Sequence, residues 1–305
     1  MTECERLIEN GTFSPDFFKP EVRCDFLVDE KRKKIWAIEI DLMLQFERVC
    51  EKHGLQYWLS SGSMLGAIRH RGFIPWDDDI DIIMPRRDFD IFVGLGEEFE
   101  HPYFLQTHAT DPECYFSFPK LRNSNTSSIS QMYAWQEMNH GIGIDIYPLD
   151  ETDTVKGPRI FSAIDALNRE LSTFMRMKHP NLDDQNKRRV AAYCGRDPGD
   201  IYAEVQHLAR EAAGDDKECV AQFLSTVTTY PKNHLRKCDL AETILWDYES
   251  FKFRIPRGYD GCLKDFFGDY MKFPPVEKRV GHYGSVFEPD VPYSQLVAEY
   301  RKAGS

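Results

Sequence analysis

Apolar residues recur at spacings of three and four between Lys31 and His53, which is the repeat of a helix with one buried face. The residues of this stripe are Ile35, Ile38, Leu42, Phe46 and Val49. Gly54 follows at the position where a helix end favours a left-handed residue. The pattern therefore predicts a helix over 31–53 whose stripe packs against a sheet.

Shorter apolar runs predict strands that alternate with helices. Strands are expected at 55–59, 77–84, 103–107, 116–122, 126–130, 140–150 and 245–255. Helices are expected at 64–69, 85–99, 157–178, 201–213, 217–229 and 259–267. The turn at 123–125 predicts that the strands on either side of it form a hairpin. This alternation is typical of an α/β (α+β) fold, with a mixed central sheet flanked by helices.

The same patterns divide the chain into four parts. They are a lead-in over 1–30, a catalytic core over 31–150, an additional helical region over 151–240, and a C-terminal part over 241–305 that packs on the core. In the lead-in, Pro15 and Pro20 interrupt any helix. Residues 183–186 and 196–199 are expected to be linkers between helices.

Composition identifies a globular protein and narrows its partners. The 305 residues are 42% hydrophobic and 13% aromatic, which is enough for real cores. The net charge of −12 disfavours a nucleic-acid substrate. No apolar run is long enough to span a membrane and the first residues do not resemble a signal peptide, so we expect a cytoplasmic protein. None of the eight cysteines forms a Cys-x-x-Cys pair, so neither a zinc site nor a redox pair is indicated.

An acidic segment precedes the apolar run at 82–84. In an extended chain Asp77, Asp79 and Asp81 share one face, while Asp78 and Ile80 share the other. Carboxylates on one face repel each other unless cations lie among them, and hard oxygen ligands suit Mg²⁺ or Mn²⁺. The alternative is an inert, solvated acidic turn.

Alternation makes Asp78 different from its neighbours. Its side chain is expected to point away from the cation face, at the rim of an apolar surface. There it should bond a backbone amide or an arginine such as Arg69 or Arg71.

A turn of small residues, Ser61, Gly62 and Ser63, opens the short helix predicted at 64–69. Backbone N–H groups, hydroxyls and the absence of bulk are what a phosphate group requires. The turn is therefore a candidate phosphate site.

Asp145 lies among isoleucines in a strand that is expected to be central. A buried, isolated carboxylate is costly, which a metal or a proton-accepting role would explain. Gly141 and Gly143 are expected to leave room for a substrate beside it. The alternative is an aspartate that caps a strand end.

Lys120 and Arg122 share one face of the strand predicted at 116–122. Two cations at this spacing can clamp a phosphate, although a solvated strand edge has the same pattern.

The small-residue turn followed by Asp79-x-Asp81 is similar to the nucleotidyltransferase superfamily. The residues between them make the chain resemble the LicD family, whose core fukutin-related proteins share. These residues are Gly66, Arg69, Gly72 and the run Trp76-Asp77-Asp78-Asp79. The run 268–271, Gly-Asp-Tyr-Met, extends the resemblance, which covers about 35–282.

The resemblance implies metal-dependent transfer of a phospho-alcohol, phosphocholine above all, from a CDP-activated donor to a sugar hydroxyl, with release of CMP. It implies a nucleotidyltransferase-type sheet and Mg²⁺ or Mn²⁺ as cofactor. The implied catalytic residues are Asp79, Asp81 and Asp145, and the implied metal ligands are these three with Asp77. The implied substrate-binding residues are Ser61, Gly62, Ser63, Arg69, Lys120 and Arg122. Whether Asp145 binds the metal or accepts the proton stays open.

The implied partners are a CDP-linked alcohol and a glycan or glycolipid acceptor; a lipid-linked acceptor would bring peripheral membrane contact. Trp246, Tyr259 and Tyr270 could contribute to a cage for a quaternary ammonium, with core packing as the other interpretation. Three alternative functions stay open: a ribitol- or glycerol-phosphate transferase, a nucleotidyltransferase that releases pyrophosphate, and an inactive binding protein on the same fold.

Overall fold

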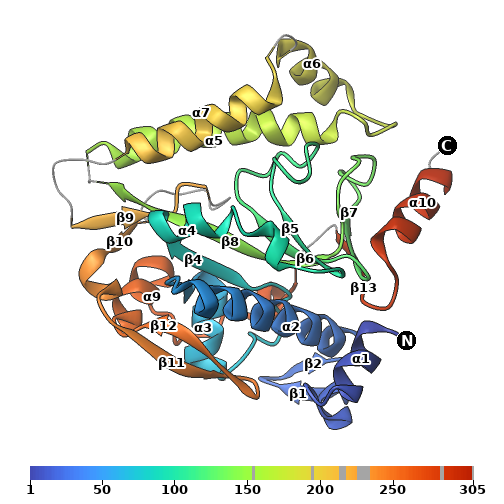
Figure 1. Ribbon diagram of the computed structural model, residues 1–305, viewed down its shortest axis with the longest axis vertical. Helices are drawn as coiled ribbons and strands as arrows, with labels where there is room; N and C mark the ends of the chain where they lie inside the picture. The colour runs from blue at the N-terminus through green and yellow to red at the C-terminus, as the bar shows by residue number, and fades with distance from the viewer. Residues whose placement is uncertain (153–154, 194–195, 213–217, 225–233, 282–284, 304–305) are drawn as a thin grey trace.

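The computed structural model describes residues 1–152, 155–193, 196–212, 218–224, 234–281 and 285–303. A mixed sheet lies at its centre in the order β10-β9-β8-β4-β3, and β6 and β5 extend from β8 (Figure 1). β4 (Asp81–Pro85) and β8 (Ile142–Thr152) run parallel, whereas the other described pairs of this sheet are antiparallel. The expected α/β fold with a mixed central sheet is confirmed.

The long strand β8 organises the sheet. Its first residues pair with β6 and its last with β9, so these two short strands share one edge of β8 while β4 occupies the other. The remaining strands of this sheet are β3 (Trp58–Leu59), β5 (Tyr103–Gln106), β6 (Lys120–Asn123), β9 (Cys219–Ala221) and β10 (His234–Arg236).

Helix α2 (Glu30–His53) covers one face of the sheet and packs against β6 and β8. The Asp29 side chain caps its start, and Gly54 ends it in the left-handed conformation at φ 65°. The helix predicted at 31–53 is therefore confirmed. α3 (Ser61–His70) begins earlier than predicted, at the small-residue turn, and α4 (Arg86–Phe92) ends earlier than predicted.

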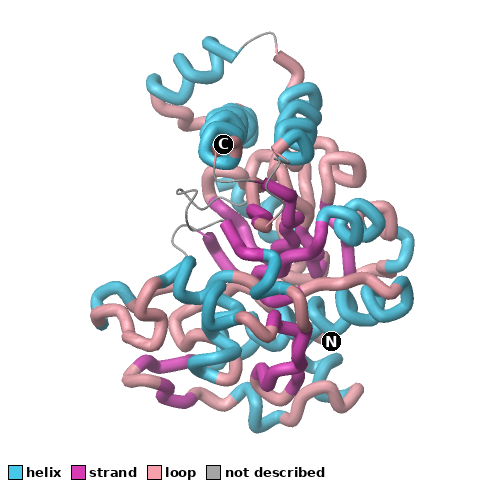
Figure 2. Tube along the Cα trace, turned by 90° about the vertical axis from the view of Figure 1, so that its left-hand side faces the viewer, coloured by secondary structure: helices cyan, strands magenta, loops and turns pink. Residues whose placement is uncertain are grey.

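A second group of helices lies on the opposite side of the sheet. α5 (Gly157–Arg176) and α7 (Pro198–Glu211) pack side by side, with α6 (Asp184–Tyr193) beyond them (Figures 1 and 2). The linker predicted at 183–186 is wrong, because α6 begins there. The helix predicted at 217–229 is also wrong where it is described, since β9 forms at Cys219; residues 225–233 lie outside the described part.

The strand predicted at 245–255 is a hairpin of β11 (Thr243–Tyr248) and β12 (Phe251–Pro256), which packs against α3 and β3. α9 (Tyr259–Phe267) follows with its predicted bounds. The lead-in is more ordered than predicted, with α1 (Glu3–Glu9) and the hairpin of β1 (Glu21–Arg23) and β2 (Phe26–Val28). Short 3₁₀ turns form at η1 (Pro15–Phe18), η2 (Gly96–Glu98), η3 (Lys237–Leu240) and η4 (Val276–Lys278).

The hairpin predicted on either side of 123–125 does not form. β6 pairs with β5 and β8, whereas β7 (Ser127–Ser130) pairs with β13 (Ser285–Glu288), just before α10 (Tyr293–Ala303). Long-range packing determines which strands pair here, and the sequence of a local turn does not predict it.

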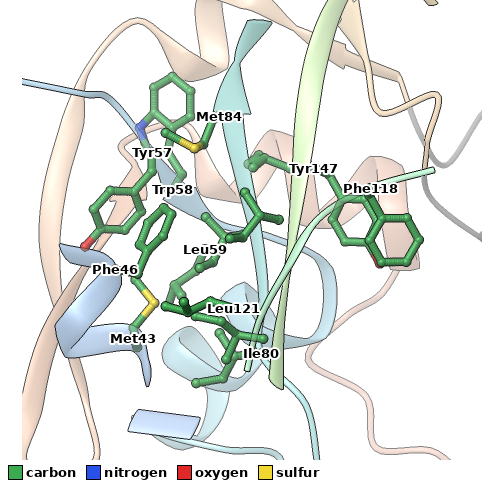
Figure 3. Packing of buried hydrophobic residues seen from close by; sticks show 14 of the residues in the cluster. Met43, Phe46, Tyr57, Trp58, Leu59, Ile80, Met84, Phe118, Leu121 and Tyr147 are labelled. Carbon is green, nitrogen blue, oxygen red and sulfur yellow. The ribbon is translucent and has the colours of Figure 1, made fainter. Parts of the chain in front are cut away.

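The core lies between α2 and the sheet. Figure 3 shows Met43 and Phe46 of α2 beside Tyr57 and Leu59, with all four side chains buried. This packing supports the strands that carry the acidic residues. Among the described helices, none has both the length and the apolar character needed to cross a bilayer.

Candidate active site

Three strands place charged side chains in one row. Lys120 of β6 lies opposite Asp145 of β8, and Asp145 lies opposite Asp81 of β4. Directly paired residues project from the same face of a sheet. The structure therefore brings together three of the residues singled out in the sequence.

Asp145 is held by two donors. The Lys120 ammonium donates to Oδ1, and the Tyr147 hydroxyl donates to Oδ2 over 3.1 Å. Both side chains of the ion pair are largely buried, at 17% and 16% exposed. Tyr147 was not singled out in the sequence, although an aromatic residue two positions along the same strand was a visible signal.

The acidic segment enters the sheet later than predicted. β4 begins at Asp81, and residues 77–80 precede the strand. Two side chains of α2 hold the segment, since Arg32 Nη1 and Trp36 Nε1 donate to the Asp77 carbonyl over 2.8 and 3.0 Å. The segment is therefore attached to the helix that covers the sheet.

Asp78 has an arginine beside it, as predicted. It is 7% exposed and lies 3.6 Å from Arg32 Nη1. A Cβ at Gly281 would lie 2.4 Å from its Oδ2. The expected arginine partner is present, but it comes from α2 rather than being Arg69 or Arg71.

The small-residue turn lies against the acidic segment. The Ser63 hydroxyl accepts a hydrogen bond from the Asp81 N–H over 2.8 Å, and a Cβ at Gly62 would lie 3.0 Å from Asp77 Oδ2. Ser61 has a positive φ of 44°, a conformation that is costly for a residue with a side chain. The start of α3 and the carboxylates therefore form one site.

Two candidate arginines make structural contacts. Arg69 Nη1 donates to the Tyr270 carbonyl over 2.7 Å, near the C-terminal end of α3 and thus away from the turn. Arg122 is 6% exposed and donates to Gln106 Oε1 and to the Gly141 carbonyl. Neither side chain joins the row of Lys120, Asp145 and Asp81.

The room expected beside Asp145 is filled by the chain itself. A Cβ at Gly143 would lie 2.9 Å from Arg122 Cγ, and one at Gly141 would lie 2.1 Å from the Asn123 carbonyl oxygen. These glycines therefore allow β6 to approach β8 closely, and the expected substrate space is wrong.

The aromatic residues considered as a cage join α9 to its neighbours. Trp246 Nε1 donates to the Ala67 carbonyl, its ring lies 5.6 Å from that of Tyr259, and the Tyr270 hydroxyl donates to Asp260. These contacts correspond to the packing interpretation.

The electrostatic environment strongly perturbs the carboxyl group of Asp79. Burial, together with the charges of Asp77, Asp81, Glu39 and Asp145, raises its pKa well above the ordinary range. A cation bound beside Asp79 would offset the negative charge of its neighbours.

Glu39 of α2 is a further carboxyl beside this segment that sequence reasoning missed. It is 1% exposed, its Oε2 has no hydrogen-bond partner, and burial followed by the charges of Asp78 and Asp77 raises its pKa well above the ordinary range. The available signal was an acidic residue inside the apolar run 35–43.

Glu39→Gln should stabilise the metal-free protein at pH 7.5 by about 1–3 kcal/mol, because it removes a buried, incompletely bonded acid. The raised pKa means that folded protein keeps a proton which unfolded protein releases above its ordinary value of 4.5. Stability of the unmodified protein should therefore fall as the pH rises above about 4.5, and the advantage of the variant should grow. Urea unfolding at pH 4 and 7.5 measures this, with the exposed Glu97→Gln as control. An equal difference at both pH values would contradict the assignment.

The donor chemistry fits a divalent cation. Within the ranges that the structure describes, no three acidic, histidine or cysteine side chains are already grouped as a ligand set. However, Asp81 and Asp145 are paired in register, Asp79 is destabilised by its neighbours' charge, and Lys120 supplies a positive charge at Asp145. Carboxylate oxygens that already attract a cation suit Mg²⁺ or Mn²⁺.

A mixed sheet that joins aspartates on neighbouring strands beside a Ser-Gly-Ser helix start agrees with the resemblance to the nucleotidyltransferase superfamily. Residues 54–164 match the family described as LicD/FKTN/FKRP, nucleotidyltransferase domain. The predicted resemblance to the LicD family is therefore confirmed for the part of the chain that holds the small-residue turn, the acidic segment and Asp145.

Two kinds of relative accompany this match. The chain is 26% identical to the lipopolysaccharide cholinephosphotransferase LicD of Haemophilus influenzae over 251 residues, which are 80% of this chain and 92% of that protein. A shorter stretch of 34 residues is 56% identical to the ribitol 5-phosphate transferase FKRP of Homo sapiens, covering 11% of this chain and 7% of that protein.

Proposed function

We propose that this protein transfers phosphocholine from CDP-choline to a sugar hydroxyl of a cell-surface glycan or its precursor, and releases CMP. The observation that carries the proposal is the row of Lys120, Asp145 and Asp81, with Asp79 and the turn at 61–63 beside it. Support also comes from the cholinephosphotransferase, because its similarity spans most of both chains.

In the proposed reaction, the sugar oxygen bonds to the phosphorus of phosphocholine. The bond between that phosphorus and the bridging oxygen of the donor breaks, and the bridging oxygen leaves with CMP. Asp79 and Asp81 would hold Mg²⁺ or Mn²⁺, with Asp77 assisting. The bound cation would neutralise charge on the phosphate oxygens and on the leaving CMP. The hydroxyl proton passes to a carboxylate, and Asp145 either accepts it or completes the ligand set.

The chain's other groups would bind the donor. Backbone N–H groups at the start of α3 would bind the phosphate, because the first N–H groups of a helix have no partner within the helix. Lys120 would turn from Asp145 to a donor phosphate once the cation is bound. Arg69 and Arg122 would support the fold around the site rather than contact the donor.

The proposal places the protein in the cytoplasm, where CDP-activated donors are made. The acceptor would be a glycan or glycolipid, and a lipid-linked acceptor would bring the protein to a membrane surface. Nucleic acid is not a proposed partner, given the net charge of −12.

A donor screen tests the proposal. CDP-choline, CDP-ribitol, CDP-glycerol and CTP are each incubated with protein and Mg²⁺ or Mn²⁺, with EDTA as control, and CMP and pyrophosphate are quantified. Metal-dependent CMP release from CDP-choline supports the proposal. Preference for CDP-ribitol or CDP-glycerol would show that another phospho-alcohol is transferred. Pyrophosphate released from CTP would identify a nucleotidyltransferase. The absence of any product would indicate a binding protein.

Lys120→Ala should raise the KM for CDP-choline at least about tenfold, because a charge-assisted phosphate contact is lost. Divalent metal affinity should stay or increase, since no ammonium then competes for Asp145. Initial-rate kinetics and calorimetric metal titration measure the two effects. An unchanged KM would show that Lys120 pairs with Asp145 and does not contact the donor phosphate.

A further inference from the structure

Two aromatic rings lie beside the ammonium group of Lys120. Its Nζ lies 5.1 Å from the ring centroid of Phe116 and 5.1 Å from that of Phe118. The two rings are 5.7 Å apart at 34°, and the ammonium also bonds Asp145. A cation therefore already lies against two neighbouring aromatic rings at the carboxylate row.

Two tyrosines extend this arrangement. The Tyr147 ring lies beside that of Phe118 (Figure 3), and their centroids are 4.5 Å apart. The Tyr133 ring lies 5.9 Å from that of Phe116, at 80°. Phe118 and Tyr147 are buried, whereas Phe116 and Tyr133 are half-buried. We call Phe116, Phe118, Tyr133 and Tyr147 the aromatic corner.

The corner has the chemistry that a quaternary ammonium requires. A trimethylammonium group donates no conventional N–H hydrogen bond, so proteins recognise it through the faces of aromatic rings and nearby negative charge. Asp145 supplies that charge beside the rings. Only two methylene groups separate the ammonium of phosphocholine from its ester oxygen, so its cation must bind next to the reacting phosphate.

The same corner is poorly suited to a polyol. Phe116 and Tyr133 pack against a small buried cluster of Cys114, Met138 and Met175. Hydroxyl groups placed against such a surface would lose hydrogen bonds to water. The corner thus discriminates between the alcohols that the family's chemistry could transfer.

We propose that the aromatic corner binds the trimethylammonium group of the donor, and that the Lys120 ammonium occupies its place until the donor arrives. This inference rests on the proposed function and deepens it, because it assigns the choice of alcohol to Phe116, Phe118 and Tyr133.

A neutral isostere tests the corner without turnover. Calorimetry in the presence of Mg²⁺ compares the Kd of CDP-choline with that of CDP-3,3-dimethylbutanol, in which carbon replaces the charged nitrogen. The protein should bind CDP-choline about tenfold more tightly. Phe116→Leu should reduce this ratio to about threefold or less, whereas Phe116→Tyr should keep it. Phe267→Leu, an exposed substitution on α9, is the matched control.

The outcomes separate this inference from the proposed function. Equal binding of the two donors, or an unchanged ratio in a folded Phe116→Leu protein, would show that the aromatic corner does not bind the trimethylammonium group. CMP release from CDP-choline would still support the proposed phosphocholine transfer. Binding of neither donor, with no CMP release, overturns both. If Phe116→Leu does not fold, Tyr133→Leu replaces it, and the same ratio decides.

Discussion

Asp79→Asn and Asp81→Asn should each reduce metal-dependent CMP release by about a thousandfold, because each removes a charged ligand oxygen from the site that stabilises the phosphoryl oxygens. Metal affinity, measured by calorimetry or by Mn²⁺ resonance, should fall in parallel. Metal-free Asp79→Asn protein should be at least as stable as the unmodified chain, since the pKa of Asp79 is raised by burial and by its neighbours' charge.

Asp78→Asn is the matched control for these variants. It makes the same chemical change one position away, but Asp78 has Arg32 as its partner. The variant should lose part of an ion pair and retain metal affinity. If it is as damaging as Asp79→Asn, the segment wraps around the cation and the alternation argument fails. An active Asp81→Asn protein would remove the metal assignment itself.

Asp150→Ala should destabilise the protein by about 3–5 kcal/mol, the largest stability effect we expect, because it leaves a largely buried charge without its partner. Asp150 is 2% exposed, and Arg86 Nε and Nη2 each donate to its carboxylate over 2.6 Å. Burial raises the pKa of Asp150, whereas the hydrogen bonds and the charge of Arg86 lower it. The ionised form of Asp150 is therefore stabilised by Arg86.

Urea unfolding measures this loss, with Asp90→Ala as control. Asp90 also contacts Arg86, at 3.5 Å, but is 41% exposed, so its removal should cost below about 1 kcal/mol. CMP release from folded Asp150→Ala protein should remain, because Asp150 lies five residues beyond Asp145 on β8. Equal destabilisation by both variants would show that burial of the pair contributes little.

Local periodicity predicted the structural features that depend on residues close together in the sequence. It located α2 and α9 and indicated an arginine partner for Asp78. It could not predict partners distant in sequence, such as β13 for β7 or Arg32 for Asp78. Residues 219–221 show the same difficulty, because a short apolar run joins the sheet only when the edge of β8 is available.

The burial of individual side chains could not be predicted from the sequence either. Lys120 and Arg122 are equivalent in an alternating pattern, but one lies opposite Asp145 and the other opposite Gly143, where close packing buries it. Glu39 shows the converse, since its buried position followed from the packing of a whole helix. Sequence therefore indicated which residue types form the site, whereas the surrounding elements determined which of them reach it.

The pairing of Asp81 with Asp145 also affects how the protein folds. These residues are 64 positions apart on parallel strands, so the chain must close a long loop before the two side chains meet. Such non-local contacts slow folding, and a nascent chain that has not yet emerged past β8 lacks Asp145. The ability to bind a cation should therefore appear late during refolding, after the local helices have formed.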